Sequence, residues 1–269
     1  MTRAQGIAYG AVQGLSEFLP VSSSAHLTLL PWFAGWEDPG LGFDVALHVG
    51  TLLAVLWYFW RDWWELAQGA IASLGGSGEG RENGLLFWKV VVASIPAAIV
   101  GVALEHKAEE AFRAPVLIAA ALAALGALLY WGDRRPESRV RLQSIDWMDA
   151  LWIGAAQAAA IVPGVSRSGV TITAARLRGI GREASARFSF LLSTPVIAGA
   201  SLLKVRALAA AGHDPAQLLA LVASAFFGFL AIGGLIRYVR QRSYLPFVLY
   251  RFALAALVIV VAVARAWPA

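Results

Sequence analysis

The segment formed by residues 10–26, GAVQGLSEFLPVSSSAH, gathers the side chains best suited to chemistry in this sequence. Gln13 and Glu17 are one helical turn apart, and Pro20 precedes three consecutive serines and His26. Polar and ionisable groups are costly in hydrocarbon, so a cluster of them within an apolar segment marks a functional site.

Glu17 is the strongest signal in this segment. An ionised carboxylate holds a divalent cation or accepts a proton, and Gln13 places an amide oxygen one turn away. The sequence therefore predicts a site for Mg²⁺ or Ca²⁺ at Glu17 with Gln13. The alternative is a carboxylate that merely faces water, with Gln13 and its counterpart Gln157 bonding backbone groups freed at a helix break.

The serines Ser22, Ser23 and Ser24 have two interpretations. One of them is expected to cap a helix that begins near Ala25. Three hydroxyls exceed what a cap needs, and hydroxyls with backbone N–H groups at a helix N-terminus bind anions. A serine is also a nucleophile when a base lies near it, and His26 is the nearest candidate. The alternative is that His26 is a core residue whose ring nitrogens are hydrogen-bonded within the protein.

A related stretch, GAAQAAAIVPGVSRSG, spans residues 154–169 and contains Arg167. Two serines and two glycines surround this arginine: Ser166, Ser168, Gly164 and Gly169. An arginine deep in a membrane needs an anionic partner. That partner is either Glu17 or a phosphate group, whose oxygens match the planar guanidinium. The glycines would let the backbone approach such a ligand closely.

The composition assigns the chain to a membrane. Of its 269 residues, 59% are apolar and only 14% are charged, whereas soluble domains are roughly 45–50% apolar and about 25% charged. There is no cysteine, which excludes disulfide and thiolate chemistry. We expect no cleavable signal peptide, because polar residues interrupt the first apolar stretch. The net charge of +5 is read as membrane topology, and no nucleic-acid partner is predicted.

Six stretches have the roughly 20 apolar residues that a transmembrane helix needs. They cover about residues 42–60, 85–104, 115–132, 184–204, 218–236 and 247–264. Two more apolar stretches are broken in the middle, at 7–19 with 25–34 and at 151–162 with 170–177. Each half is too short to cross, so we predict two re-entrant helix hairpins whose breaks face each other inside the bundle.

The order of elements predicts an inverted repeat within one membrane domain, residues 1–269. Each half, about 1–132 and 148–266, has one hairpin and three spans, and an odd number of spans inverts the second copy. At an offset of 144 residues, Gly10 corresponds to Gly154 and Ser23 to Arg167. Ile161 and Val170 fall opposite Glu17 and His26, so the second copy lacks the acid and the histidine.

The distribution of Lys and Arg predicts the orientation. The face where the first hairpin starts carries six of them, and the other face carries 15, Arg251 included. We therefore expect the 15 to be cytoplasmic, with the N-terminus and the active site outside or periplasmic. The arginines between residues 134 and 141 are read as topological, with unspecific contact to anionic lipid. Asp44 and His48 are candidates for the same cavity as Glu17, or for a cap and a packing contact.

The motifs QGLSEFLPVSSSAH and PGVSRSG resemble the two signature stretches of the bacterial undecaprenyl-diphosphate phosphatase family, of the bacitracin-resistance type. The segments FDVALHVGTLLAV, ASIPA, FSFLLSTP and YLPFVLYRF are similar to family segments in family order. The resemblance implies the inverted-repeat fold with crossed hairpins. It also implies hydrolysis of undecaprenyl diphosphate to undecaprenyl phosphate and inorganic phosphate in the bacterial inner membrane, recycling the lipid carrier for peptidoglycan.

The resemblance also implies roles for individual residues. Glu17 is the second acid of the family's (Glu/Gln)-x-x-x-Glu motif, and Gln13 is its first member, which removes one possible carboxylate ligand. Ser23 and His26 are the catalytic pair, and Arg167 binds phosphate. The competing class is an inverted-repeat transporter or flippase of lipid phosphate or another anion. Small residues along the spans are compatible with a homodimer.

Overall fold

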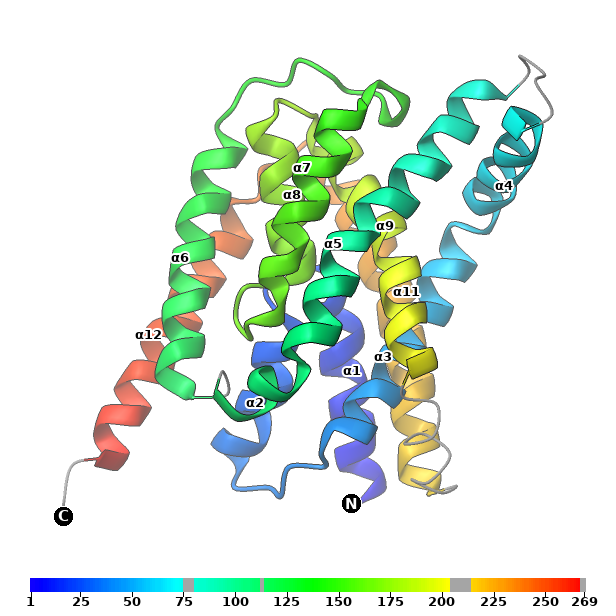
Figure 1. Ribbon diagram of the computed structural model, residues 1–269. Helices are drawn as coiled ribbons and strands as arrows, with labels where there is room; N and C mark the ends of the chain where they lie inside the picture. Colours follow the sequence, from blue (N-terminus) through cyan, green and yellow to red (C-terminus); the bar gives the residue numbers. More distant parts are fainter. Residues whose placement is uncertain (75–79, 112–113, 204–213, 267–269) are drawn as a thin grey trace.

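The computed structural model describes residues 1–74, 80–111, 114–203 and 214–266, and apart from one isolated bridge its regular structure there is helical (Figure 1). The α-helices are α1 (Arg3–Phe18), α2 (Ser23–Ala34), α3 (Leu41–Tyr58), α4 (Trp60–Leu74), α5 (Arg81–Ala111), α6 (Pro115–Asp133), α7 (Trp147–Gln157), α8 (Arg167–Leu177), α9 (Arg182–Leu203), α11 (Pro215–Val239) and α12 (Leu245–Ala266). Two short 3₁₀ helices, η1 (Leu142–Ser144) and η2 (Ala158–Ile161), flank α7.

Within the described ranges, five helices are long and apolar enough to cross a membrane, which confirms the prediction of an all-α protein with several membrane-spanning helices. They are Arg81–Leu104, Pro115–Asp133, Arg182–Leu203, Pro215–Val239 and Leu245–Ala266. Each contains most of one predicted span; the last residue predicted for the fourth, Lys204, lies outside the described residues. Large apolar side chains such as Ile99, Val222 and Val260 are exposed on their outer faces, as lipid contact requires.

The predicted span at 42–60 corresponds to α3, which ends two residues earlier, at Tyr58. The helix breaks at Phe59, and α4 continues at an angle of 75° to α3. The polar run that follows Trp60 cannot continue an apolar span, and Asp62 pairs with Arg187 of α9 instead. Helix α4 then packs closely on α5, since a Cβ on Gly69 would lie 2.6 Å from the Gly84 nitrogen. Taken together, α3 and α4 are long and apolar enough to count as a sixth, bent span.

The two broken apolar segments fold close to where the pattern predicts. Helix α1 ends at Phe18 and α2 begins at Ser23, while α7 and η2 end at Ile161 and α8 begins at Arg167. In Figure 1 the chain reverses direction at each break, and both loops lie in the middle of the bundle. The second helix of each pair starts a few residues earlier than expected because a serine caps it.

A row of glycines holds α1 against α11. Gly6, Gly10 and Gly14 face α11, and a Cβ on Gly14 would lie 2.6 Å from the Ser224 carbonyl oxygen. Small residues allow two helix backbones to approach this closely. Because the glycines lie on one side of α1, the packing also fixes the direction in which Glu17 points.

Candidate active site

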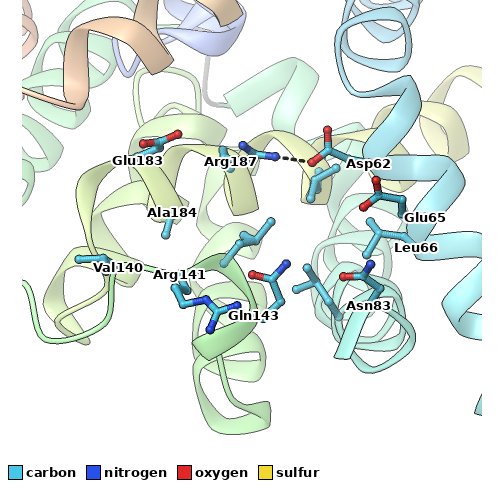
Figure 2. A pocket seen from close by; sticks show the side chains of 13 residues that line it. Asp62, Glu65, Leu66, Asn83, Val140, Arg141, Gln143, Glu183, Ala184 and Arg187 are labelled. Atoms are coloured by element: carbon cyan, nitrogen blue, oxygen red, sulfur yellow. Dashed lines mark hydrogen bonds and ion pairs between the residues drawn. The ribbon is translucent and has the colours of Figure 1, made fainter. Parts of the chain in front are cut away.

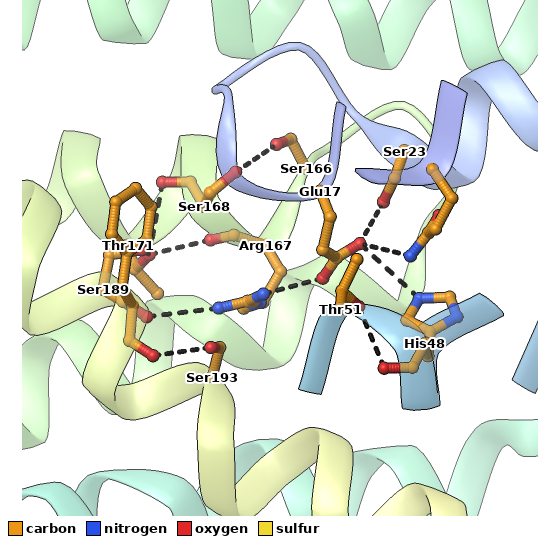
Figure 3. Close-up of polar contacts among 12 residues, drawn as sticks. Glu17, Ser23, His48, Thr51, Ser166, Arg167, Ser168, Thr171, Ser189 and Ser193 are labelled. Carbon is orange, nitrogen blue, oxygen red and sulfur yellow. Dashed lines mark hydrogen bonds and ion pairs between the residues drawn. The ribbon is translucent and has the colours of Figure 1, made fainter. Parts of the chain in front are cut away.

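The end of α1 and the start of α8 bring Glu17 and Arg167 together. Arg167 Nη2 donates to Glu17 Oε1 at 2.7 Å, and Arg167 Nη1 donates to the Ser189 carbonyl at 3.2 Å (Figure 3). The side chains are only 12% and 6% exposed, so the pair is screened from water. The two motifs, 150 residues apart, therefore meet at one buried ion pair.

The second oxygen of Glu17 gathers three further side chains (Figure 3). Ser23 Oγ donates to Oε2 at 2.5 Å and Gln13 Nε2 donates at 3.1 Å. His48 Nε2 lies 3.6 Å from the same oxygen. A carboxylate that accepts a hydrogen bond from a serine hydroxyl can take its proton as that oxygen becomes a nucleophile. The predicted residues Gln13, Glu17, Ser23 and Arg167 thus form one cluster.

The two serine loops have the same local geometry. Ser22 caps α2 and Ser166 caps α8, with φ of 77° and 72°. Positive φ is uncommon for residues other than glycine, and such strain concentrates at functional sites. In each loop the capping hydroxyl lies 3.2 Å from the serine two residues later, Ser24 or Ser168. The expectation that a serine caps the second helix is confirmed.

Hydrogen bonds join the two loops directly. The Gly164 amide donates to Ser22 Oγ at 3.1 Å, and Ser168 Oγ donates to the Leu19 carbonyl at 3.0 Å. Gly164 itself has φ of 98°, which favours glycine, and a Cβ there would lie 2.7 Å from the Ile118 carbonyl oxygen. Ser22, Gly164 and Ser168 were predicted to bind substrate. In the structure, their hydrogen bonds fix the position of one loop relative to the other.

The two histidines occupy different surroundings. His26 Nδ1 lies 2.7 Å from the Ser22 carbonyl, so it carries the proton, and Nε2 accepts from the Tyr250 hydroxyl at 2.6 Å. His48 Nδ1 lies 2.7 Å from the Asp44 carbonyl, which turns Nε2 toward Glu17. His48 thus lies in the same site as Glu17, whereas His26 borders it through the serine loop.

Sequence reasoning missed Arg251, which the charge count places at the cytoplasmic face. Its side chain is fully buried in α12, and its guanidinium donates to backbone carbonyls of both loops and of α6. The acceptors are Pro20 at 3.2 Å, Ala121 at 3.5 Å, Leu122 at 3.1 Å, Gly164 at 2.8 Å and Val165 at 3.2 Å. In the sequence, the only signal for Arg251 was its place in the family-like segment YLPFVLYRF, and that segment indicated no role for it. Arg251 ties the loops together.

The two glutamines of the repeat differ from expectation. Gln157 is buried, and neither of its amide atoms has a hydrogen-bond partner in the described structure, so it does not bond freed backbone groups. Gln13 donates to Glu17, and its Oε1 is buried without a partner. The structural role proposed for Gln157 is therefore wrong.

A pocket of about 260 Å³ opens elsewhere, among α4, α5 and α9 (Figure 2). None of the predicted site residues lines it. Its wall carries the carboxylates of Asp62, Glu65 and Glu183 and the guanidinium groups of Arg141 and Arg187, of which Arg187 is paired with Asp62. With three carboxylates against two arginines, the wall has no excess of positive charge to hold a diphosphate, so the chemistry indicated by the motifs lies at Glu17 and Arg167.

Comparison with known proteins agrees with these motifs. A family model described as "Bacitracin resistance protein BacA" matches residues 6–257. The chain is 52% identical to an undecaprenyl-diphosphatase of Moorella thermoacetica over 97% of its length and 98% of the relative. It is also 52% identical to an undecaprenyl-diphosphatase of Desulforudis audaxviator, over 98% of its length and all of the relative. The chain therefore belongs to the bacitracin resistance protein BacA family.

Proposed function

We propose that this protein hydrolyses undecaprenyl diphosphate to undecaprenyl phosphate and inorganic phosphate. The observation that carries the proposal is the buried cluster in which Ser23 and Arg167 contact the two oxygens of Glu17. A hydroxyl, a carboxylate and a guanidinium within an apolar bundle suit phosphoryl transfer on a lipid, where catalysis is mostly positioning and charge stabilisation. The reaction would recycle the carrier lipid for peptidoglycan and contribute to bacitracin resistance.

In the proposed reaction, Ser23 Oγ attacks the terminal phosphorus. A bond forms between Oγ and phosphorus, the bridging P–O bond breaks, and undecaprenyl phosphate leaves. Glu17 receives the hydroxyl proton. In the following step His26 takes a proton from the water that attacks the phosphoserine, the bond between Oγ and phosphorus breaks, and Glu17 returns its proton to Ser23 Oγ as inorganic phosphate leaves. Arg167 donates hydrogen bonds to the phosphate oxygens as well as to Glu17. Backbone N–H groups at the start of α2 donate to the same phosphate.

We also propose a divalent cation, Mg²⁺ or Ca²⁺, at Glu17. No group of three or more His, Cys, Asp or Glu side chains among the described residues could hold a metal ion alone. Glu17 and the unpartnered Oε1 of Gln13 offer two oxygens, and Mg²⁺ commonly uses one or two carboxylates with substrate phosphates as further ligands. These residues fit a cation that arrives with the diphosphate, where it would neutralise phosphate charge.

The test of the function is phosphate release from undecaprenyl diphosphate by purified protein in detergent, where no membrane gradient exists. We expect release that EDTA suppresses and Mg²⁺ or Ca²⁺ restores. Binding of the lipid without any phosphate release, under every cation condition, would instead favour a transporter or flippase of lipid phosphate.

Replacing Ser23 with alanine is expected to abolish measurable turnover, because the variant lacks the oxygen that forms the phosphoserine. Acid quenching of the wild type during turnover of lipid labelled at the terminal phosphate should trap label on Ser23, detected by mass spectrometry of the peptide. Ser16→Ala is the matched control, since Ser16 Oγ only donates to the Val12 carbonyl of its own helix. Substantial turnover by Ser23→Ala would assign the attack to water or to His26.

The two histidines should differ in kinetic effect. We expect His26→Ala to lower kcat about 10²–10⁴-fold, the usual range for loss of a proton-transfer group. We expect His48→Ala to lower kcat about tenfold. His48 Nε2 lies 3.6 Å from Glu17 Oε2, and its role in the proposal is to position that carboxylate. Steady-state kinetics of the two variants decides the assignment, and a His48→Ala loss as large as that of His26→Ala would move proton transfer to His48.

For the membrane arrangement we propose an inverted repeat with two re-entrant hairpins, α1–α2 and α7–α8, in the bacterial inner membrane with the active site toward the periplasm. The matching caps Ser22 and Ser166 support the repeat. Because the chain has no cysteine, single cysteines at Thr2 and Gln143 can be labelled in cells with an impermeant maleimide. Labelling at Gln143 rather than Thr2 would reverse the proposed orientation.

A further inference from the structure

A second cavity, of about 470 Å³, lies where α6 ends and α12 begins, at the end of the bundle opposite the N-terminus (Figure 1). Its wall carries four arginines and two carboxylates, a net charge of +2. None of the Glu17 cluster lines it. Arg167 and Arg176 are nine residues apart on α8, about 14 Å along the helix axis. The cavity is therefore separate from the candidate active site.

Two of the four arginines are neutralised by the protein itself. Arg182 Nε donates to Asp133 at 2.6 Å, and Arg182 Nη1 donates to Glu137 at 3.2 Å. The fully buried Arg176 lies 3.7 Å from Asp133 and 3.6 Å from Glu137. Its Nε has no hydrogen-bond partner among the described residues, so one buried donor in the cavity wall is still unsatisfied.

The other two arginines, Arg134 and Arg135, supply the excess charge. Within the described ranges neither makes an ion pair; each guanidinium instead lies over an aromatic ring, 4.2 Å from the centre of Tyr130 and 4.8 Å from the centre of Trp131. Their place at the α6 C-terminus also suits the helix dipole. The helix dipole accounts for positive charge at this position. It does not account for the fact that both arginines line one cavity, each with its guanidinium group stacked on an aromatic ring.

The surroundings of the cavity indicate a lipid ligand. Tyr130, Trp131 and Leu245 are 38%, 54% and 41% exposed, as aromatic and apolar residues at a membrane interface are. Ser243 forms another part of the wall, and its hydroxyl can donate a hydrogen bond to an anion. We propose that this cavity binds the phosphate headgroup of an anionic membrane lipid, with Arg134 and Arg135 as its main contacts.

The test measures lipid binding to the detergent-purified protein by native mass spectrometry. We expect phosphatidylglycerol to bind at least about tenfold more tightly than phosphatidylcholine with the same acyl chains, because each basic residue contributes to attraction of an anionic headgroup. Arg134→Gln with Arg135→Gln should reduce phosphatidylglycerol binding to the phosphatidylcholine level. The matched control, Arg61→Gln with Arg237→Gln, removes the same charge and includes an arginine over Trp60; it should retain tight binding.

Three results would overturn the proposal. Equal loss of binding in both double variants would make the effect one of overall charge. Equal binding of the two lipids by the wild type would remove the anion preference. Complete displacement of phosphatidylglycerol by millimolar inorganic phosphate would assign the cavity to free phosphate instead of lipid.

Discussion

Arg167→Ala is expected to lower phosphate release from undecaprenyl diphosphate by about 10³-fold, the scale seen when a charge-stabilising arginine is removed from phosphoryl transfer. Arg167 is the cation that touches Glu17, at 2.7 Å, and its donors are placed to share phosphate oxygens. Arg167→Lys should also be impaired, because an ammonium cannot reproduce the guanidinium fork. Release is measured as kcat/KM in detergent.

A loss of folding must be separated from this loss of chemistry. Removing Arg167 alone leaves the buried Glu17 carboxylate without its guanidinium partner, and breaking a buried ion pair in this way costs about 3–5 kcal/mol. The double variant Glu17→Gln with Arg167→Met removes both charges, so it should regain thermal stability but not turnover. Arg240→Ala is the control for arginine removal, since Arg240 pairs with Glu183 at an exposed site. Near wild-type activity of well-folded Arg167→Ala would refute the phosphate-binding role.

Arg251→Met is expected to lower the thermal midpoint by about 10 °C. The substitution leaves carbonyl oxygens of both loops and of α6 buried without a donor, at a total cost of about 3–5 kcal/mol. Arg251→Lys should give an intermediate midpoint, since three donors cannot serve five acceptors. The midpoint is read by heating the detergent-purified protein and measuring the remaining monodisperse fraction.

Arg265→Met provides the matched control on the same helix. Arg265 is exposed, its guanidinium lies 4.5 Å from the centre of the Trp32 ring, and it donates to the Trp32 carbonyl at 2.9 Å. Its loss should move the midpoint by about 2 °C or less, as surface substitutions do. Equal midpoints for Arg251→Met and Arg265→Met would show that the loops do not depend on Arg251.

The local features of the fold were predictable because each depends on neighbouring residues. Runs of apolar residues long enough to span a membrane identified the five long helices. Pro20 and the serines that follow identified the break and the cap of α2, since capping is a contact over three residues. Glu17, Ser23 and Arg167 stood out because charged and polar groups are rare in apolar segments, and the structure brings all three together.

The sequence by itself determined the membrane class, the helices and the motif residues, whereas only the tertiary structure decided their partners. Arg251 looked like one more topological arginine, because its acceptors are backbone carbonyls 86 to 231 residues away and backbone carries no signature in the sequence. The sequence left two alternatives for His48, and helix packing decided that it lies beside Glu17. Packing also brings His26 to Tyr250, a contact that no spacing encodes. The polar run after Trp60 indicates where the apolar helix ends, but the angle of 75° between α3 and α4 depends on the contacts of α4 with α5 and α9.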